Sequence, residues 1–271
     1  MSPSPQEQAQ TERFASSYER HQSPVMHRVE RRVWGCDYGG TSWTTRDEAD
    51  RIAGLLELRP GLRILDLGSG SGWPALYWAA ATGCDAVLTD LPLTGLRIAA
   101  ARAASDRPPG NCWFSVADGT ALPFADDSFE AISHSDVLCC LSDKAGALQS
   151  CARVLGPNGR MVFSVIYIAP NLSGAAYDRA EDAGPPCVEA EADYPTLLNR
   201  TGWRIAGQID VTENFAETIR RLIREEEHES EAMAVLFGEM ALAERWAGHR
   251  LKLAALEDGL LRREIFNVDR G

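Results

Sequence analysis

The sequence lacks several features that would place it in other classes of protein. No apolar run approaches the roughly 20 residues of a membrane-spanning helix, and no charged-then-apolar signal peptide opens the chain. The seven cysteines are irregularly spaced and form no CxxC pair, which argues against a disulfide framework and a zinc site. We therefore expect a globular protein of the reducing cytoplasm, with no membrane span and no bound metal.

Basic residues are also few relative to acidic ones. The 271 residues include 27 Lys and Arg against 39 Asp and Glu, a formal net charge of −12. An acidic surface repels phosphate backbones, so no nucleic-acid partner is expected. Because 45% of the residues are hydrophobic, the chain can bury a large core, and its length fits one domain with a covering element.

One stretch, residues 64–79, has the pattern of a strand, a glycine turn and a helix. An apolar run typical of a buried parallel strand comes first. Gly68, Gly70 and Gly72 then follow at every second residue, so the backbone can approach a ligand closely beside helix N–H groups. Trp73 stands where a dinucleotide fingerprint has its third glycine, and no Lys-Ser/Thr pair follows as in a P-loop.

An aspartate ends or closely follows each of the first four predicted strands. Asp66 ends the first strand, where a buried carboxylate needs a donor such as a ligand ammonium. Asp90 ends the second strand, 24 residues later, and a carboxylate there can accept both hydroxyls of a ribose. Asp118 and Asp136 come just after the third and fourth strands. Alternating strands and helices predict a parallel sheet, so these carboxylates should converge at one edge.

The glycine turn with its preceding aspartate resembles the first motif of class I S-adenosylmethionine (SAM)-dependent methyltransferases. The resemblance continues in Asp118-Gly119-Thr-Ala-Leu-Pro-Phe124 and in the Arg-Val-Leu-x-Pro-x-Gly pattern of residues 153–159. It implies a doubly wound, mostly parallel, seven-stranded Rossmann-like α/β sheet with N-terminal helices and a helical insertion between strands six and seven. The single domain would comprise a tail and helical lid (1–50), a SAM-binding core (51–212), the insertion (213–258) and a final strand (259–271).

The resemblance also implies roles for residues at the edge of the sheet. Asp66 would position the ammonium group of SAM, Asp90 would bind its ribose and Asp118 its adenine. The other residues implied in cofactor binding are Gly68, Ser69, Gly70, Gly72, Leu91, Gly119, Ser135 and Trp43.

The implied reaction moves the methyl group of SAM to an O, N or C atom of a small-molecule acceptor, leaving S-adenosylhomocysteine (SAH). His134 and Asp136 lie near the tip of the fourth strand and are candidates for proton removal or acceptor contact. For His134 a position inside the strand favours a packed, hydrogen-bonded core histidine over a catalytic one. Tyr38, Tyr167 and Asn171 are candidates for lining the acceptor side.

Alternatives to this function stay open. A non-catalytic SAM-binding subunit would bind the cofactor without turnover, and a doubly wound reductase would bind NADH, although Trp73 argues against it. The insertion at 213–258 carries apolar residues at helical spacing, so it either covers the substrate or forms a dimer interface. The chain is accordingly expected to be a monomer or a homodimer.

Three segments carry local expectations. Residues 1 to about 10 have the composition of a disordered tail. Residues 169–186 have the composition of a loop, and the acidic run 225–231 has that of a solvated surface.

Overall fold

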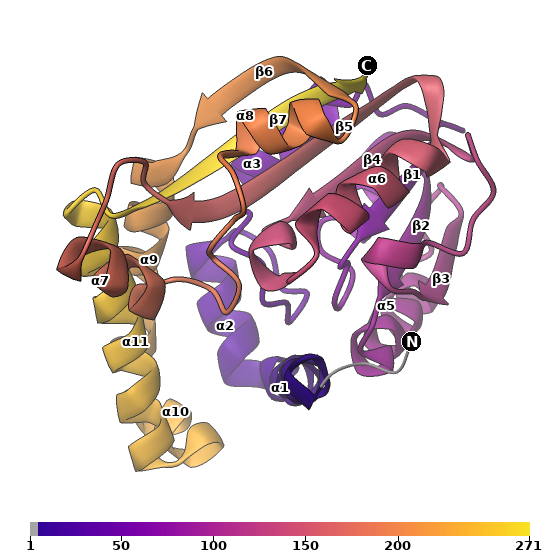
Figure 1. Cartoon of the computed structure of the whole chain (residues 1–271). Helices are drawn as coiled ribbons and strands as arrows, with labels where there is room; N and C mark the ends of the chain where they lie inside the picture. Colours follow the sequence, from indigo (N-terminus) through magenta and orange to yellow (C-terminus); the bar gives the residue numbers. More distant parts are fainter. Residues whose placement is uncertain (1–4) are drawn as a thin grey trace.

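The fold is built on one seven-stranded sheet with the order β3-β2-β1-β4-β5-β7-β6 (Figure 1). The computed structural model describes the backbone of residues 5–271 and the side chains from residue 8 onward. Strands β1 to β5 pair in parallel, and β7 pairs antiparallel with both β5 and β6, as expected from the sequence. The strands are β1 (Arg63–Leu67), β2 (Asp85–Asp90), β3 (Cys112–Val116), β4 (Phe129–Ser135), β5 (Leu155–Ile168), β6 (Trp203–Asp210) and β7 (Leu261–Arg270).

Helices pack on both faces of the sheet, which gives two large apolar clusters. Helices α3, α4 and α5 contribute to the cluster on one face, and α6, α7 and α8 to the cluster on the other. The helices are α1 (Pro5–His21), α2 (Pro24–Val33), α3 (Arg46–Leu55), α4 (Ala75–Thr82), α5 (Leu93–Asp106), α6 (Lys144–Val154), α7 (Ala175–Ala183), α8 (Tyr194–Arg200), α9 (Thr212–His228), α10 (Ser230–Phe237) and α11 (Glu239–Glu257), with short turns η1 (Gly119–Ala121) and η2 (Leu138–Cys140).

The start of α3 shows how a local sequence signal fixes an element. Thr45 Oγ1 accepts a hydrogen bond from the Glu48 backbone N–H at 3.3 Å, and Glu48 Oε2 accepts one from the Thr45 N–H at 3.1 Å. This reciprocal capping box is the one that the Thr-x-x-Glu spacing predicts. It also fixes the Glu48 side chain at the base of the helix. The other carboxylate oxygen, Oε1, forms a buried ion pair with Arg263.

Three local expectations were wrong. Within the predicted tail, residues 1–4 lie outside the described residues, but residues from Pro5 onward are helical because α1 packs against the domain. The predicted loop at 169–186 contains α7. In the acidic run, Glu226 is fully buried and accepts two hydrogen bonds from Arg245, so this part of the run faces inward.

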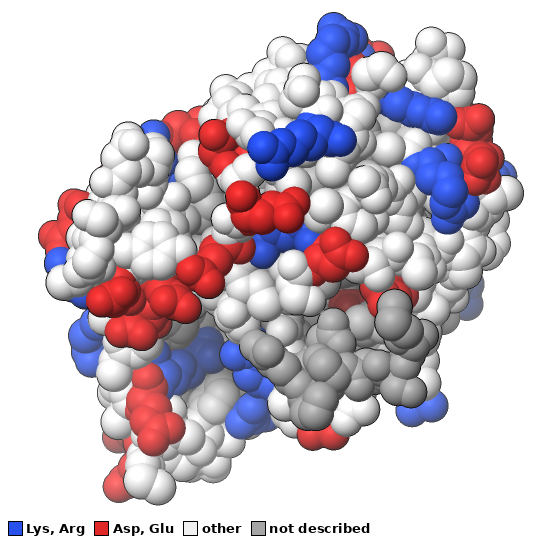
Figure 2. Space-filling model, in the orientation of Figure 1, with Lys and Arg blue, Asp and Glu red and all other residues white. Residues whose placement is uncertain are grey.

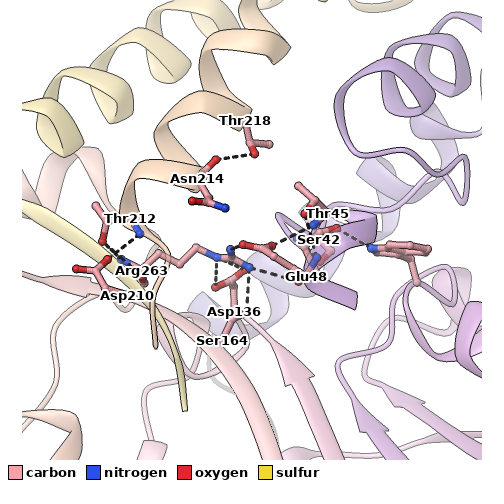
Figure 3. A network of polar contacts seen from close by, with 12 residues as sticks. Ser42, Thr45, Glu48, Asp136, Ser164, Asp210, Thr212, Asn214, Thr218 and Arg263 are labelled. Atoms are coloured by element: carbon pink, nitrogen blue, oxygen red, sulfur yellow. Dashed lines mark hydrogen bonds and ion pairs between the residues drawn. The ribbon is translucent and has the colours of Figure 1, made fainter. Parts of the chain in front are cut away.

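A buried arginine on β7 joins segments that are far apart in the sequence (Figure 3). The Arg263 Nε lies 3.0 and 3.1 Å from the two oxygens of Asp136, which follows β4. Its Nη1 donates to Glu48 Oε1 at 2.8 Å, and its Nη2 donates to Ser164 on β5 at 3.1 Å and to Thr44 at 3.3 Å. Only 1% of the Arg263 side chain is exposed. The network therefore holds α3 and the preceding loop against the sheet.

The described surface carries both signs of charge. On the face in Figure 2, the described Lys and Arg side chains are interspersed with Asp and Glu and do not merge into one basic area. No helix among the described residues is long and apolar enough to cross a membrane. Within the same part of the chain, no group of three His, Cys, Asp or Glu side chains could hold a metal ion.

Replacing the central arginine should strongly destabilise the protein. Arg263→Met leaves Asp136 and Glu48 buried without their cation, so the free energy of unfolding should fall by about 3–5 kcal/mol in urea titration. The matched control is Arg204→Met, which breaks an exposed pair with Asp269 and should cost less than about 1 kcal/mol. Equal losses for the two variants would contradict a structural role for the network.

Candidate active site

A cavity of about 1110 Å³ opens at the carboxyl ends of the parallel strands. It is lined by the glycine turn after β1, by the segments that follow β2, β3 and β4, and by residues of α1 and α11. Ligands of open α/β sheets bind at this edge, and the volume exceeds that of a typical single-ligand pocket. The cavity therefore has room for a cofactor and a second small molecule.

The glycine turn brings the backbone close to its neighbours. Gly68 has φ +69°, and a Cβ there would lie 2.5 Å from Val137 Cγ2. Gly70 has φ +52°, and its Cβ would lie 3.0 Å from the Tyr18 ring. Any larger residue would be both strained and crowded, so these positions need glycine. The turn, including Ser69 and Gly70, lines the cavity as predicted.

Asp66 is a buried carboxylate that lines the cavity without a partner for one oxygen. Only 2% of the residue is exposed, and its Oδ2 has no hydrogen-bond partner among the described residues. Burial raises the pKa of Asp66 well above its usual range, and the nearby Asp90 raises it further. The hydroxyls of Ser71 and Ser135, which also line the cavity, are likewise buried without a described partner. A ligand ammonium would satisfy such a set of acceptors.

Asp90 at the end of β2 is held by three donors. Its Oδ2 accepts from the Gly70 N–H at 2.8 Å and from the Tyr18 hydroxyl at 3.2 Å, and its Oδ1 accepts from the Leu91 N–H at 2.8 Å. Burial raises the pKa of Asp90 to about 6, although these three hydrogen bonds lower it. Each oxygen keeps capacity for a further donor, as a ribose diol requires.

The remaining predicted cofactor residues also lie at the cavity, with the exception of Gly72. Leu91 is 43% exposed beside Asp90, so its side chain is free to pack on a flat ring. Asp118 caps η1, because its Oδ1 accepts from both the N–H and the hydroxyl of Thr120 at 2.9 and 2.8 Å. Gly119 and Trp43 line the cavity as well. At Gly72 a Cβ would lie 2.6 Å from Leu76 Cδ1 of α4, so the turn requires glycine there although Gly72 does not line the cavity.

Helix α1 closes the cavity from a part of the sequence where no contact residue was predicted. Tyr18 donates to Asp90, and the Gln10 side chain donates to the Cys140 carbonyl at 2.8 Å. Trp43 lies between this helix and the insertion, with its ring 5.0 Å from that of Phe215 on α9. This cover was predicted from the sequence only in general terms, as a helical lid within residues 1–50.

The two candidate bases are in unsuitable surroundings. His134 is fully buried, stacks on Phe163 at 4.5 Å and does not line the cavity, and burial lowers its pKa to about 3. Its position in β4 opposite Leu67 and Phe163 turns it into the core. Asp136 does line the cavity, but both its oxygens are engaged by Arg263. We therefore assign a general-base role to neither residue.

The three predicted acceptor contacts lie away from the cavity. Tyr38 packs on Trp73 at 5.2 Å and lies under the Arg102 guanidinium. Tyr167 packs against Tyr194 at 5.6 Å, and Asn171 is exposed in the turn after β5. Tyr38 and Tyr167 pack against the two core clusters, so their side chains do not line the cavity. The cavity is lined instead by residues that include Val137, Cys139, Cys140, Ile166 and Lys252.

Comparisons with known proteins agree with this geometry. A family model described as a methyltransferase domain matches residues 65–163. The chain is 29% identical over 196 residues to a 27-O-demethylrifamycin SV methyltransferase of Amycolatopsis mediterranei, covering 67% of this chain and 71% of that protein. The family model, the relatives and the fold support a class I SAM-dependent methyltransferase. SAM is the cofactor of this family, and the unpartnered acceptors around Asp66 fit its ammonium group.

Two solved structures share the methyltransferase fold. A phosphoethanolamine N-methyltransferase 2 of Haemonchus contortus, in complex with SAH, has a TM-score of 0.78 at 18% identity, covering 95% of this chain and 60% of that one. The structure of the [4+2]-cyclase SpnF has a TM-score of 0.72 at 22% identity and covers 96% of both chains. The match thus extends beyond the sheet to the N-terminal helices and the insertion.

Removing the charge of Asp66 should weaken cofactor binding and at the same time stabilise the free protein. Asp66→Asn should weaken SAH binding about 10- to 100-fold in calorimetric titration, because a charge-assisted hydrogen bond is lost. The free protein should become more stable by roughly 0.5–2 kcal/mol, since a buried unpaired carboxylate is removed. Its raised pKa means that Asp66 costs stability as pH rises above about 4, so the gain should grow toward neutral pH.

The control for this variant is Asp85→Asn, at the opposite end of β2, where Asp85 accepts from Asn111. That change should leave SAH affinity unaltered. SAH affinity within about twofold of wild type for Asp66→Asn would contradict the assignment of Asp66.

SAH affinity should fall at mildly acidic pH. Ribose hydroxyls favour the ionised form of Asp90, whose pKa is about 6 in the free protein, so protonation below that pH competes with binding. The wild-type affinity should drop by up to about tenfold per pH unit below this value. Asp90→Asn should bind more weakly at pH 8 and lose the part of the drop centred near pH 6. A wild-type affinity that stays constant between pH 8 and pH 5 would show that Asp90 does not contact the ligand.

Proposed function

We propose that this protein transfers the methyl group of SAM to a nucleophilic O, N or C atom of a small-molecule acceptor. The observation that carries the proposal is the burial of Asp66 at the carboxyl edge of the sheet. One of its oxygens has no hydrogen-bond partner among the described residues, and the charged group that acts on it is Asp90. The neighbouring Asp90 and the glycine turn complete a site for an aminoacyl nucleoside. The methyltransferases among its relatives act on small molecules, which supports the same class of acceptor.

Different residues of the cavity would bind different parts of the cofactor. Asp66 would hold the ammonium group of the cofactor, Asp90 the ribose hydroxyls and Asp118 the adenine amino group. SAM supplies an electrophilic methyl group when bound. Val137 and Ile166 give the acceptor side apolar walls, which exclude water from a reaction that loses positive charge.

Positioning rather than proton removal is the proposed basis of rate acceleration. His134 does not line the cavity, and both oxygens of Asp136 accept from Arg263. An acceptor that arrives as a free amine or as an anion needs no general base, and alignment of two bound molecules by itself can supply a large part of the acceleration.

We further propose that α1 and the 213–258 insertion cover the substrate. Lys252 of α11 and Trp43 both line the cavity, and α9 packs on α2 beside it. This favours substrate cover over a dimer interface, and the chain could act as a monomer or a homodimer. No disulfide joins any of the seven cysteines, which supports location in the reducing cytoplasm.

A second function is favoured by one of the fold neighbours. SpnF matches this chain over 96% of both lengths, and it is described as a [4+2]-cyclase. The same cavity could therefore bind the cofactor while it promotes a reaction other than methyl transfer. A non-catalytic cofactor-binding subunit would share that property.

An acceptor screen separates these functions. The protein would be incubated with SAM and a panel of phenols, quinones, macrolide hydroxyls, amines and phosphoethanolamine, and products would be detected by mass spectrometry. Methyl transfer adds CH2 to one class of acceptor with stoichiometric formation of SAH, and Asp66→Asn should reduce the rate about 10-fold or more at limiting SAM.

The outcomes of the screen differ for each alternative. An isomerised acceptor of unchanged mass would favour the cyclase function. Tight SAH binding without any turnover across the panel would contradict methyl transfer to these acceptor classes. Failure of the folded protein to bind SAH would contradict the cofactor assignment itself.

A further inference from the structure

Lys252 of α11 places a cation on the acceptor side of the cavity. The residue lines the cavity together with Val137, Cys140 and Ile166. Among the described residues its ammonium donates one hydrogen bond, to the Ala183 carbonyl at the end of α7, at 2.8 Å. An ammonium has three N–H donors, so two are left for other acceptors. No carboxylate among the described side chains forms an ion pair with it.

Lysine is rare in this chain, which makes its place in the cavity informative. The sequence contains only two lysines, Lys144 and Lys252, among 27 basic residues. Lys144 is buried and donates to the carbonyls of Leu141 and Cys187 at 2.9 and 2.8 Å, so it has a structural role. Lys252 has no comparable set of partners and faces the cavity.

The charge of Lys252 is poorly compensated by the protein. Burial lowers the pKa of Lys252, while Cys139, Cys140 and Asp136 raise it and Arg13 lowers it further. Of these groups only Asp136 is a carboxylate, and both its oxygens already accept from Arg263 Nε, at 3.0 and 3.1 Å. An ammonium in apolar surroundings without a counter-ion is costly, and a bound anion would relieve that cost.

Charged side chains of both signs line the cavity. Asp66 and Asp90 lie at the ends of β1 and β2, toward the β3 edge of the sheet. Lys252 donates to the end of α7, and α11 packs against α7 (Figure 1). Glu12, Arg13 and Asp143 also line the cavity, as do apolar residues such as Val137 and Ile166. The carboxylates at the ends of β1 and β2 suit a cationic cofactor and its hydroxyls, and the Lys252 ammonium suits an anion.

We propose that Lys252 selects acceptors that carry an oxyanion on an apolar body and holds that oxygen in the cavity. This inference rests on the proposed methyltransferase function and names its substrate class. Lys252 acts as a specificity residue, because it binds a group on the acceptor and takes no part in moving the methyl group. The oxyanion can belong to a phenolate, an enolate or a carboxylate, which share the ability to accept hydrogen bonds from an ammonium.

A pair of fluorescent probes tests the charge preference directly. 1-Anilinonaphthalene-8-sulfonate is an apolar anion, and N-phenyl-1-naphthylamine is its neutral counterpart. Both would be titrated into the wild-type protein with and without saturating SAH. Lys252→Met should weaken binding of the anionic probe about 10-fold or more and change binding of the neutral probe less than about twofold. Lys252→Arg should restore most of the anion affinity.

The matched control is Arg250→Met, which removes a positive charge from an exposed position of the same helix. It should leave the affinity for both probes unchanged. An unchanged anion affinity in Lys252→Met, an equal loss for both probes, or an equal loss in Arg250→Met would overturn the proposal. Thermal unfolding of each variant identifies a loss of binding that comes from misfolding. If Lys252→Met is misfolded, Lys252→Arg becomes the deciding variant, and its ratio of anionic to neutral probe affinity is compared with that of wild type.

SAH titration keeps this proposal separate from the proposed function. Lys252→Met should bind SAH within about twofold of wild type, because Lys252 lies outside the cofactor end. If wild type binds no SAH, the cofactor assignment fails whatever the probes show. If SAH binds and the two probes respond equally to Lys252→Met, only the oxyanion proposal fails.

Discussion

The contacts of one buried guanidinium hold α3, the loop before it and the segment after β4 against the sheet. Arg263 on β7 joins Asp136 after β4, Glu48 at the base of α3 and Thr44 in the loop before it. Arg263 lies 127 residues from Asp136 and 215 residues from Glu48 along the chain, so the network joins segments that are distant in sequence. Removing a single partner would leave an uncompensated charge in the core, which makes the arrangement all-or-none. The same network fixes one wall of the cavity, because Asp136 lines it.

The carboxylates that line the cavity differ in their partners. Asp66, Asp90 and Asp118 lie at the ends of β1 to β3, Glu12 and Asp143 also line the cavity, and Asp136 accepts from Arg263. The carboxyls of Asp66 and Asp90 have raised pKa values, since the free protein buries them without a cation. Stability is thus given up at the positions where a positively charged ligand would bind, a common relation between binding sites and stability.

Much of the fold and the cofactor end could be predicted from sequence, because both depend on local signals. Strand ends followed by aspartate, spaced glycines and the Thr45–Glu48 capping box each specify geometry over a few residues. The acceptor side could not be predicted, since its residues come together only through tertiary packing. Lys252 lies within α11, whose sequence carries no motif that indicates a cavity, and His134 was misleading because it is buried within β4 against Phe163. The first turns of α1 were missed, because the polar composition of residues 1 to about 10 indicated a tail and conceals contacts such as that of Gln10 with Cys140.

A crystal structure of the protein with SAH tests the central claim most directly. The account predicts SAH in the cavity at the carboxyl ends of the strands, with its ammonium near Asp66, its ribose hydroxyls on Asp90 and its sulfur directed toward the Val137 and Cys140 side. Density for SAH elsewhere, or in this cavity with the adenine at Asp66, would contradict it. Either contrary result would also remove the basis for assigning the opposite end of the cavity to the acceptor.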